Sequence, residues 1–248
     1  MQGRIRVALI SDATLPAAEA IAARLARDGL RVLRNYPDGL PQAFSGADAD
    51  PDRAAFPDIR LADVEALADW AYARAGHIDH LIVSDNVIFP MPVETITEAQ
   101  FALYVDRNAK SAFLLSKVFG MRMAADCGGT VTYISSLHDD KPTGCAVAYS
   151  AGRGAVQMLA KEMALFLGRK GMRSNLVEMG TTRDIAPALD SHISPFNYDL
   201  DTKVPLGRLP GPEDCAAAVA YLISDDAAAV NGASLRIDGG HLLRYMDR

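Results

Sequence analysis

Short apolar runs alternate along the chain with longer segments in which apolar residues recur every three or four positions. The apolar runs predict buried strands at 5–10, 31–34, 79–83, 130–134, 174–178 and 234–237. The segments with helical spacing are 16–27, 62–75, 97–123, a helix that contains Tyr149 and ends near 169, and 212–223. Strands that alternate with helices over the whole length predict an α/β fold, with a doubly wound parallel sheet of about seven strands.

Two segments break this alternation. Residues 36–57 are rich in Pro, Gly, Asp and Ala, which predicts a loop with at most a short helix. Residues 180–203 are polar, contain Pro and aromatic residues, and are interpreted as a lid or substrate loop. We find no linker or internal repeat, so a single domain over 1–248 is expected. Ligands of such sheets bind beyond the carboxyl ends of the strands, where the predicted loops are 11–15, 84–89, 136–144 and 180–198.

Tyr149 and Arg153 are the strongest chemical feature of the sequence. They are four residues apart on a predicted helix and therefore share one face. A guanidinium stays protonated at any working pH, so it favours the phenolate form of a neighbouring tyrosine. Tyr149 is therefore a candidate general base. Ser136 ends a predicted strand thirteen residues earlier and is a candidate to hold the oxygen of the same substrate.

Composition narrows the classes of protein. The net charge of −6 comes with no basic block, which argues against nucleic acid as a partner. No apolar run reaches membrane-spanning length and no signal peptide opens the sequence, so no membrane partner is expected. The sequence has three widely spaced cysteines, Cys127, Cys145 and Cys215, which form no metal-binding pattern. This cysteine usage predicts a cytoplasmic protein without a metal site.

A set of motifs resembles the short-chain dehydrogenase/reductase family over nearly the full length. The motifs are Asp58-Ile59, Asn108 within Asp106 to Lys110, Ile134-Ser135-Ser136, the Tyr149 helix, Val204 to Leu209, and Ile237-Asp238-Gly239-Gly240. This resemblance implies a Rossmann-like fold and a small-molecule substrate. It also implies a homo-oligomer, a tetramer or a dimer, built on the helices that contain Asn108 and Tyr149. Asn108, Ser136, Tyr149 and Arg153 would form the catalytic set.

Departures from the family pattern concern the nucleotide. The family's dinucleotide loop has the pattern Thr-Gly-x-x-x-Gly-x-Gly, and its positions hold Ser11, Asp12, Pro16 and Ala18 here. The missing glycines serve a tight turn and close approach to pyrophosphate. Asp12 adds a negative charge where phosphate would bind. Arg153 also replaces the family's lysine. These departures predict that no nicotinamide cofactor is bound.

Halohydrin dehalogenases are similar to this pattern, because they combine a Rossmann-like sheet with Ser, Tyr and Arg and bind no nicotinamide. The resemblance implies that Ser136 binds the substrate oxygen and that Tyr149 takes the hydroxyl proton as a vicinal halide leaves. The segments 83–86 and 194–198 resemble the corresponding strand end and halide-side loop. The substrate or anion pocket would then be lined by Asp85, Met179, Gly180, Phe196 and Tyr198.

Two alternatives remain open. One is an NADP(H)-dependent oxidoreductase for a small carbonyl or pterin-type substrate, since Arg34-Asn35-Tyr36 ends the second strand without a carboxylate that would repel a 2′-phosphate. Its nucleotide would contact Ser11, Asp12, Leu15, Arg34, Asp58 and Asn86. The other is a non-enzymatic relative that keeps only the fold.

The polar residues that follow Ser136 are interpreted as a surface turn. The interpretation favoured for His138 is a solvated loop residue rather than a substrate contact, and Asp139 to Lys141 are interpreted as a charged turn.

Overall fold

Seven parallel strands form one central sheet in the computed structural model, which describes residues 4–39, 50–84, 92–142, 144, 146–183 and 204–243. The strand order is β3-β2-β1-β4-β5-β6-β7. The strands are β1 (Val7–Ile10), β2 (Arg31–Asn35), β3 (Arg53–Ala54), β4 (His80–Val83), β5 (Thr130–Ser136), β6 (Arg173–Met179) and β7 (Ser234–Ile237). The order reverses between β1 and β4, where ligands of doubly wound sheets bind. The predicted Rossmann-like sheet of about seven strands in a single domain is confirmed.

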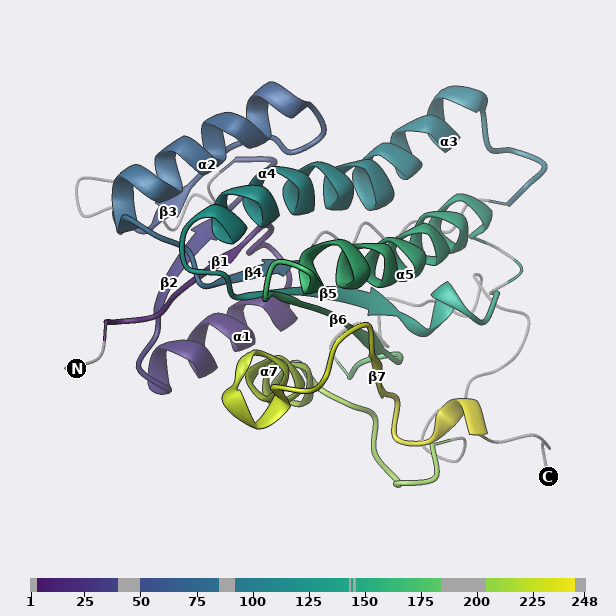
Figure 1. Cartoon of the computed structure of the whole chain (residues 1–248). Coiled ribbons are helices and arrows are strands. Elements are labelled where there is room, and N and C mark those ends of the chain that lie inside the picture. The colour runs from purple at the N-terminus through teal and green to yellow at the C-terminus, as the bar shows by residue number, and fades with distance from the viewer. Residues whose placement is uncertain are drawn as a thin grey trace.

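Helices cover both faces of the sheet (Figure 1). They are α1 (Pro16–Arg27), α2 (Leu61–Ala75), α3 (Glu98–Val105), α4 (Ser111–Ala125), α5 (Val147–Gly168) and α7 (Pro212–Ile223). Helices α2, α4 and α5 share one apolar core with Leu81, Val131 and Tyr133 of the sheet. Helices α1 and α7 share a second core with Ile82 and Ile134. Successive residues along one strand thus point alternately into the two cores, as expected for a sheet that is buried on both faces.

Several elements begin and end where the sequence predicts. Helices α1 and α7 have the predicted bounds, and both begin at a proline, whose missing N–H costs nothing in the first turn. The predicted helix over 97–123 is instead α3 and α4, joined by a π-helical turn at Asp106–Lys110. A capping box of Thr97 and Gln100 starts α3.

Strand β3 corrects the interpretation of 36–57 as a loop with at most a short helix. It contains only Arg53 and Ala54, which pair with Arg34 and Asn35 of β2. Two residues give no apolar periodicity, and the strand is fixed by tertiary contacts. The Asn35 amide hydrogen-bonds the backbone of Phe56 in both directions, and Asp50 accepts from both Arg34 and Arg53.

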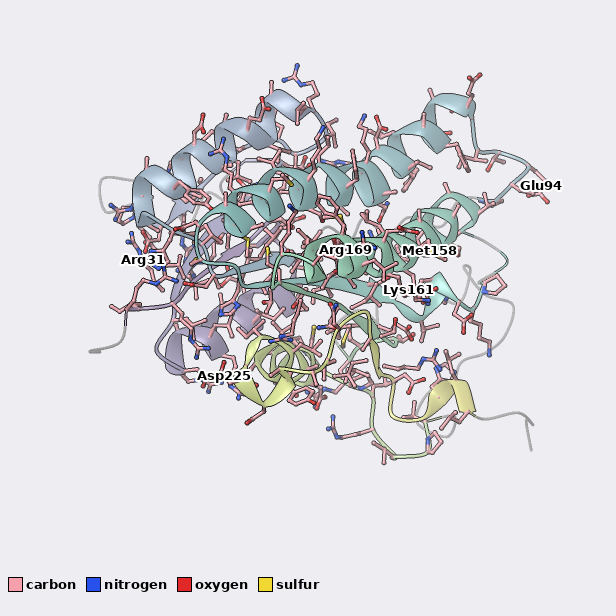
Figure 2. All side chains as sticks on the ribbon, in the orientation of Figure 1. Arg31, Glu94, Met158, Lys161, Arg169 and Asp225 are labelled. Atoms are coloured by element: carbon pink, nitrogen blue, oxygen red, sulfur yellow. The ribbon has the colours of Figure 1, made fainter. Side chains whose placement is uncertain are left out.

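Side chains extend from this framework on all sides (Figure 2). Met158, Lys161 and Arg169 mark exposed positions along α5, whose opposite face is buried against the sheet. No helix among the described residues is long and apolar enough to cross a membrane. In the same part of the chain, no group of His, Cys, Asp and Glu residues is arranged to hold a metal ion.

Candidate active site

Tyr149 and Arg153 form a buried pair on the first turns of α5. Each side chain is about 1% exposed, and the guanidinium carbon lies 5.8 Å from the centre of the tyrosine ring. The i, i+4 spacing predicted this shared face, and the structure places it against the sheet. A cation over an aromatic face in a dry environment interacts strongly. The pair therefore has the geometry in which the cation favours ionisation of the phenol.

Asn108 and the backbone of β5 hold the guanidinium in place. Arg153 donates to the Asn108 side-chain oxygen at 2.5 Å and to the Asn108 carbonyl at 3.5 Å. It also donates to the Ile134 carbonyl at 3.1 Å. Asn108 lies in the π-helical turn, and its amide donates to the Tyr104 carbonyl at 2.9 Å. The π-turn thus aims the amide oxygen of Asn108 at Arg153.

Gly152 explains how α5 comes so close to the π-turn. A Cβ at this position would lie 2.8 Å from the Cβ of Asn108, nearer than real Cβ contacts allow. Only glycine lets the helix bring Arg153 within hydrogen-bonding distance of Asn108. The sequence contains this glycine, but nothing in the local pattern predicts its partner.

Ser136 is the last residue of β5 and caps the short turn that follows. Its hydroxyl accepts from the backbone N–H of His138 at 3.4 Å, and the residue is partly exposed at the carboxyl edge of the sheet. Helix α5 begins beyond the same edge and packs against β5 and β6. Ser136 and Tyr149 are therefore brought to one edge of the sheet, as the sequence predicts.

His138 differs from its favoured interpretation as a solvated loop residue. Its ring is partly buried and lies edge-on to the Tyr149 ring, with centroids 6.1 Å apart and planes at 71°. The His138 Nδ1 lies 2.9 Å from the Lys141 carbonyl. Burial lowers the pKa of His138, the hydrogen bond to the Lys141 carbonyl opposes this shift, and the charges of His241 and Lys141 add to it. Sequence spacing gave no signal for this contact, because a short 3-10 turn at Leu137–Asp139 produces it.

Asp139 is not the solvated charged turn that the sequence suggests. Neither of its carboxyl oxygens is exposed or has a hydrogen-bond partner of normal geometry among the described residues. Burial raises the pKa of Asp139 to about 7, and the charge of Glu178 adds to this effect. Glu178 itself is buried and accepts from Arg236 at 2.9 Å. Asp139 is thus a buried carboxyl whose protonated form is favoured by its surroundings.

The loop after β1 lies at the same edge of the sheet, two strands away from Ser136. The Asp12 carboxylate accepts from both the N–H and the hydroxyl of Thr14, at 2.9 and 2.6 Å. Ser84, after β4, accepts from the Asp12 N–H and donates to its carbonyl. Ser11 is buried, and its hydroxyl accepts from the Ser84 N–H. Burial raises the pKa of Asp12.

The first turn of α1 fits a phosphate group despite the missing glycines. Leu15 is the N-cap and makes no side-chain cap hydrogen bond, so its own side chain leaves the N–H groups of the first turn available. Asp58 is buried before α2. Arg34, at the end of β2, is held by Asp50 and lies 3.8 Å from Glu19. An anion at Arg34 would therefore compete with two carboxylates.

The remaining predicted pocket residues have mixed outcomes. Met179 ends β6 and is buried in the core shared with α1 and α7, so core packing accounts for it. Gly180 follows it, where a Cβ would meet Asp238 at 2.8 Å. The residues Asp85, Asn86, Phe196 and Tyr198, and 184–203 of the predicted lid, lie outside the described residues.

Fold and site together define a Rossmann-like α/β protein with a tyrosine–arginine pair at the carboxyl edge of its sheet. A sequence profile described as Enoyl-(Acyl carrier protein) reductase matches residues 17–241. The chain therefore belongs to the short-chain dehydrogenase/reductase family, as its motifs suggest.

Named relatives extend over almost the whole chain. D-threitol dehydrogenase of Mycolicibacterium smegmatis is 30% identical over 251 residues, covering 96% of this chain and 94% of that protein. Glucose 1-dehydrogenase 2 of Bacillus subtilis is 28% identical over 247 residues, covering 96% and 95%. The structure of a gluconate 5-dehydrogenase from Burkholderia cenocepacia, in complex with NADP and tartrate, has a TM-score of 0.86 and 25% identity over 97% of this chain and 96% of that one.

These comparisons contradict the expectation that no cofactor is bound. The relatives are named dehydrogenases, and the gluconate 5-dehydrogenase structure contains NADP. A 3-ketoacyl-(acyl-carrier-protein) reductase from Brucella melitensis, solved with NADH, has the same fold with a TM-score of 0.81 and 23% identity, covering 95% of this chain and 98% of that one. None of these four proteins is a halohydrin dehalogenase, so that interpretation has no support from them. The inference failed because it equated lost glycines with lost binding, although the N-terminus of α1 remains free of a side-chain cap.

Proposed function

We propose that the protein is an NADP(H)-dependent oxidoreductase that interconverts a small secondary alcohol and its carbonyl compound. The observation that carries this proposal is the buried pair of Tyr149 and Arg153, fixed by Asn108. The cofactor, when bound, would exchange a hydride with the substrate carbon. Tyr149 would exchange the hydroxyl proton, and Ser136 would hold the substrate oxygen.

Each of these roles follows from the local chemistry. Arg153 favours the phenolate of Tyr149, because the charge is fixed and little water screens it. The uncapped N-terminus of α1 would receive the pyrophosphate, and Ser11 and Asp58 flank the strand ends where the rest of the nucleotide would lie. Asn86 belongs to the same proposed set.

Named relatives support the substrate class. Glucose, threitol and gluconate, which appear in the names of the relatives, are small polyhydroxylated molecules. We therefore expect a sugar, polyol or hydroxy acid rather than a long-chain substrate. Asp85, Gly180, Phe196 and Tyr198 remain the proposed substrate contacts, with 180–203 as the proposed substrate loop.

The preference for NADP(H) rests on the end of β2. Tyr36 is buried there, and its hydroxyl donates to Glu19. The first acidic residue after it is Asp38, which forms an ion pair with Arg107. Asp38 is paired with Arg107, and Asp50 and Glu19 are paired with Arg34, so a 2′-phosphate at this strand end would meet paired rather than free carboxylates.

The test has a binding arm and a turnover arm. Calorimetric titration with NADPH and with NADH should give saturable binding, tighter for NADPH. A panel of small polyols with NADP⁺ should then reveal turnover that falls at least 100-fold in Tyr149→Phe. Tyr221→Phe, at a half-exposed position on α7, is the matched control and should keep its activity. Folded wild-type protein that binds neither nucleotide would refute the proposal.

An assembly is also expected. Helices α4 and α5 expose large apolar side chains, including Phe113, Met121, Met158, Leu165 and Phe166. Such a surface favours a homo-oligomer, a dimer or tetramer, built on these two helices. Light scattering coupled to gel filtration would measure the mass, and a monomer at micromolar concentration would contradict this expectation. A cytoplasmic location remains part of the same proposal.

A further inference from the structure

A proton taken by Tyr149 needs an exit, and Arg153 cannot provide one. A guanidinium has five N–H donors and no acceptor, and it does not deprotonate in proteins. Arg153 is also buried, with donors directed to Asn108 and to Ile134. It can stabilise the phenolate, but it cannot receive a proton from Tyr149.

His138 is the ring that lies against Tyr149. The two rings meet edge to face, with centroids 6.1 Å apart. A backbone carbonyl can only accept a hydrogen bond, so the contact of Nδ1 with the Lys141 carbonyl at 2.9 Å places the proton on Nδ1. In the neutral ring, Nε2 is then the unprotonated nitrogen and a proton acceptor.

We propose that His138 relays the proton between Tyr149 and solvent during turnover. This inference rests on the proposed oxidoreductase function. In alcohol oxidation, NADP⁺, when bound, would be the acceptor of the hydride that leaves the substrate carbon. The hydroxyl proton passes to the Tyr149 oxygen, and from there to Nε2 of His138, directly or through a water molecule. His138 then releases the proton to solvent, and the reduction direction reverses each step.

The surroundings keep His138 suited to this exchange. The groups that face it are Tyr149 from α5, Lys141 from the end of its own turn, and His241 from the 3-10 turn at His241–Leu243. Burial lowers the pKa of His138 despite the opposing hydrogen bond to the Lys141 carbonyl, and the charges of His241 and Lys141 add to the lowering, so the neutral ring is favoured at working pH. Its partial exposure leaves a route to solvent.

A direct readout needs no cofactor. Nitrogen NMR of histidine-labelled protein at pH 7, with His138→Gln used to assign the signal, should show a neutral ring protonated on Nδ1. The opposite tautomer, with the proton on Nε2, would overturn the proposal, because that ring could not accept from Tyr149.

Kinetics provide the second readout. His138→Gln should lower kcat for polyol oxidation about 10- to 100-fold with little change in KM, and should enlarge the solvent deuterium isotope effect. Added imidazole should restore activity in the variant in proportion to its basic form, and should not accelerate the wild type. His77→Gln, at the opposite edge of the sheet, is the matched control and should behave as wild type.

The outcomes separate the relay from the proposed function. Wild-type turnover that is lost in Tyr149→Phe but kept in His138→Gln would leave the oxidoreductase assignment standing and refute the relay. A loss in His138→Gln that imidazole does not rescue, with an unchanged isotope effect, would also refute it and indicate a packing role. Absence of turnover in the wild type would refute the proposed function itself, whereas the NMR arm would still report the tautomer.

Discussion

Removal of the buried cation is the sharpest test of the site. In Arg153→Met, the side chain keeps much of its length but loses its charge, 5.8 Å from the Tyr149 ring. The phenolate charge lies mainly on the hydroxyl oxygen, so that distance gives only the order of the separation; two unit charges about 6 Å apart interact by about 3 kcal/mol at an effective dielectric of about 20. Tyr149 and Arg153 are both about 1% exposed, so solvent screening reduces this value little. Each 1.4 kcal/mol is roughly a factor of ten, so phenolate-dependent turnover should fall about 100-fold.

The pH profile separates an electrostatic effect from a general loss of activity. Because the cation favours the charged form of Tyr149, its loss shifts ionisation to higher pH. The rising limb of kcat/KM for alcohol oxidation should therefore move up in Arg153→Met. Arg153→Lys retains the charge and should keep the limb near its wild-type position. An Arg153→Met profile that overlies the wild type, with activity within threefold, would refute the reasoning.

Stability must be measured in the same variants. Arg153→Met removes the donor from the Asn108 side-chain oxygen and from the Ile134 carbonyl. Each buried acceptor left without a partner costs about 1–3 kcal/mol, so the free energy of unfolding should fall by about 2–5 kcal/mol. Denaturant unfolding followed by circular dichroism measures this loss. Kinetic assays are then run at a temperature where each variant is folded.

Three further predictions concern packing and pH. Gly152→Ala brings a Cβ to 2.8 Å from Asn108 and should lower both activity and thermal stability, by about 1–3 kcal/mol, whereas Gly154→Ala meets its nearest atom at 3.5 Å and should be tolerated. Burial lowers the pKa of His80 to about 4, so between about pH 6.5 and 4 the unfolded chain binds a proton at this residue and the native state does not. Urea titrations should therefore show the free energy of unfolding falling by about 3 kcal/mol as the pH is lowered across that window. His80→Gln should make the free energy of unfolding nearly constant over the same window. Burial raises the pKa of Asp139 to about 7, so the native state loses stability as pH rises from about 4 to 7. Asp139→Asn should therefore be about 2–4 kcal/mol more stable than wild type at pH 8 and nearly equal to it at pH 4. If the variant and the wild type are equally stable at both pH 4 and pH 8, burial of the Asp139 carboxylate is not the cause.

Sequence periodicity predicted the frame of the fold well and its shortest elements poorly. Long apolar stretches such as β5 and α5 are buried on both sides or along one stripe, so they leave a strong pattern. Strand β3 has two residues and depends on its pairing with Arg34 and Asn35 of β2, which lie nineteen residues earlier in the sequence. The π-turn at Asp106–Lys110 was also missed; its Asn108 is bound by Arg153 from another helix, a contact for which the local sequence gives no signal.

The same distinction applies to the site. Tyr149 and Arg153 were predictable because helical geometry fixes their relation locally. Ser136 could be placed because the carboxyl ends of parallel strands share one edge. His138 and Asp139 were misread, since their burial depends on how the turn after β5 packs against α5. Short polar sequences in loops carry little information on such packing.

Asp12 explains why the nucleotide was wrongly excluded from sequence alone. Its charge was counted against phosphate on the assumption that the carboxylate points toward the N-terminus of α1. In the structure the carboxylate does lie beside that terminus, but Thr14, the residue before the N-cap, already donates to it twice. Burial also raises the pKa of Asp12, so its negative charge is held less firmly than that of a solvated aspartate. The missing glycines remove conformational freedom, but they do not block the amides of α1, because no side chain caps them. A loop of this kind is compatible with a nucleotide whose pyrophosphate contacts the N-terminus of α1.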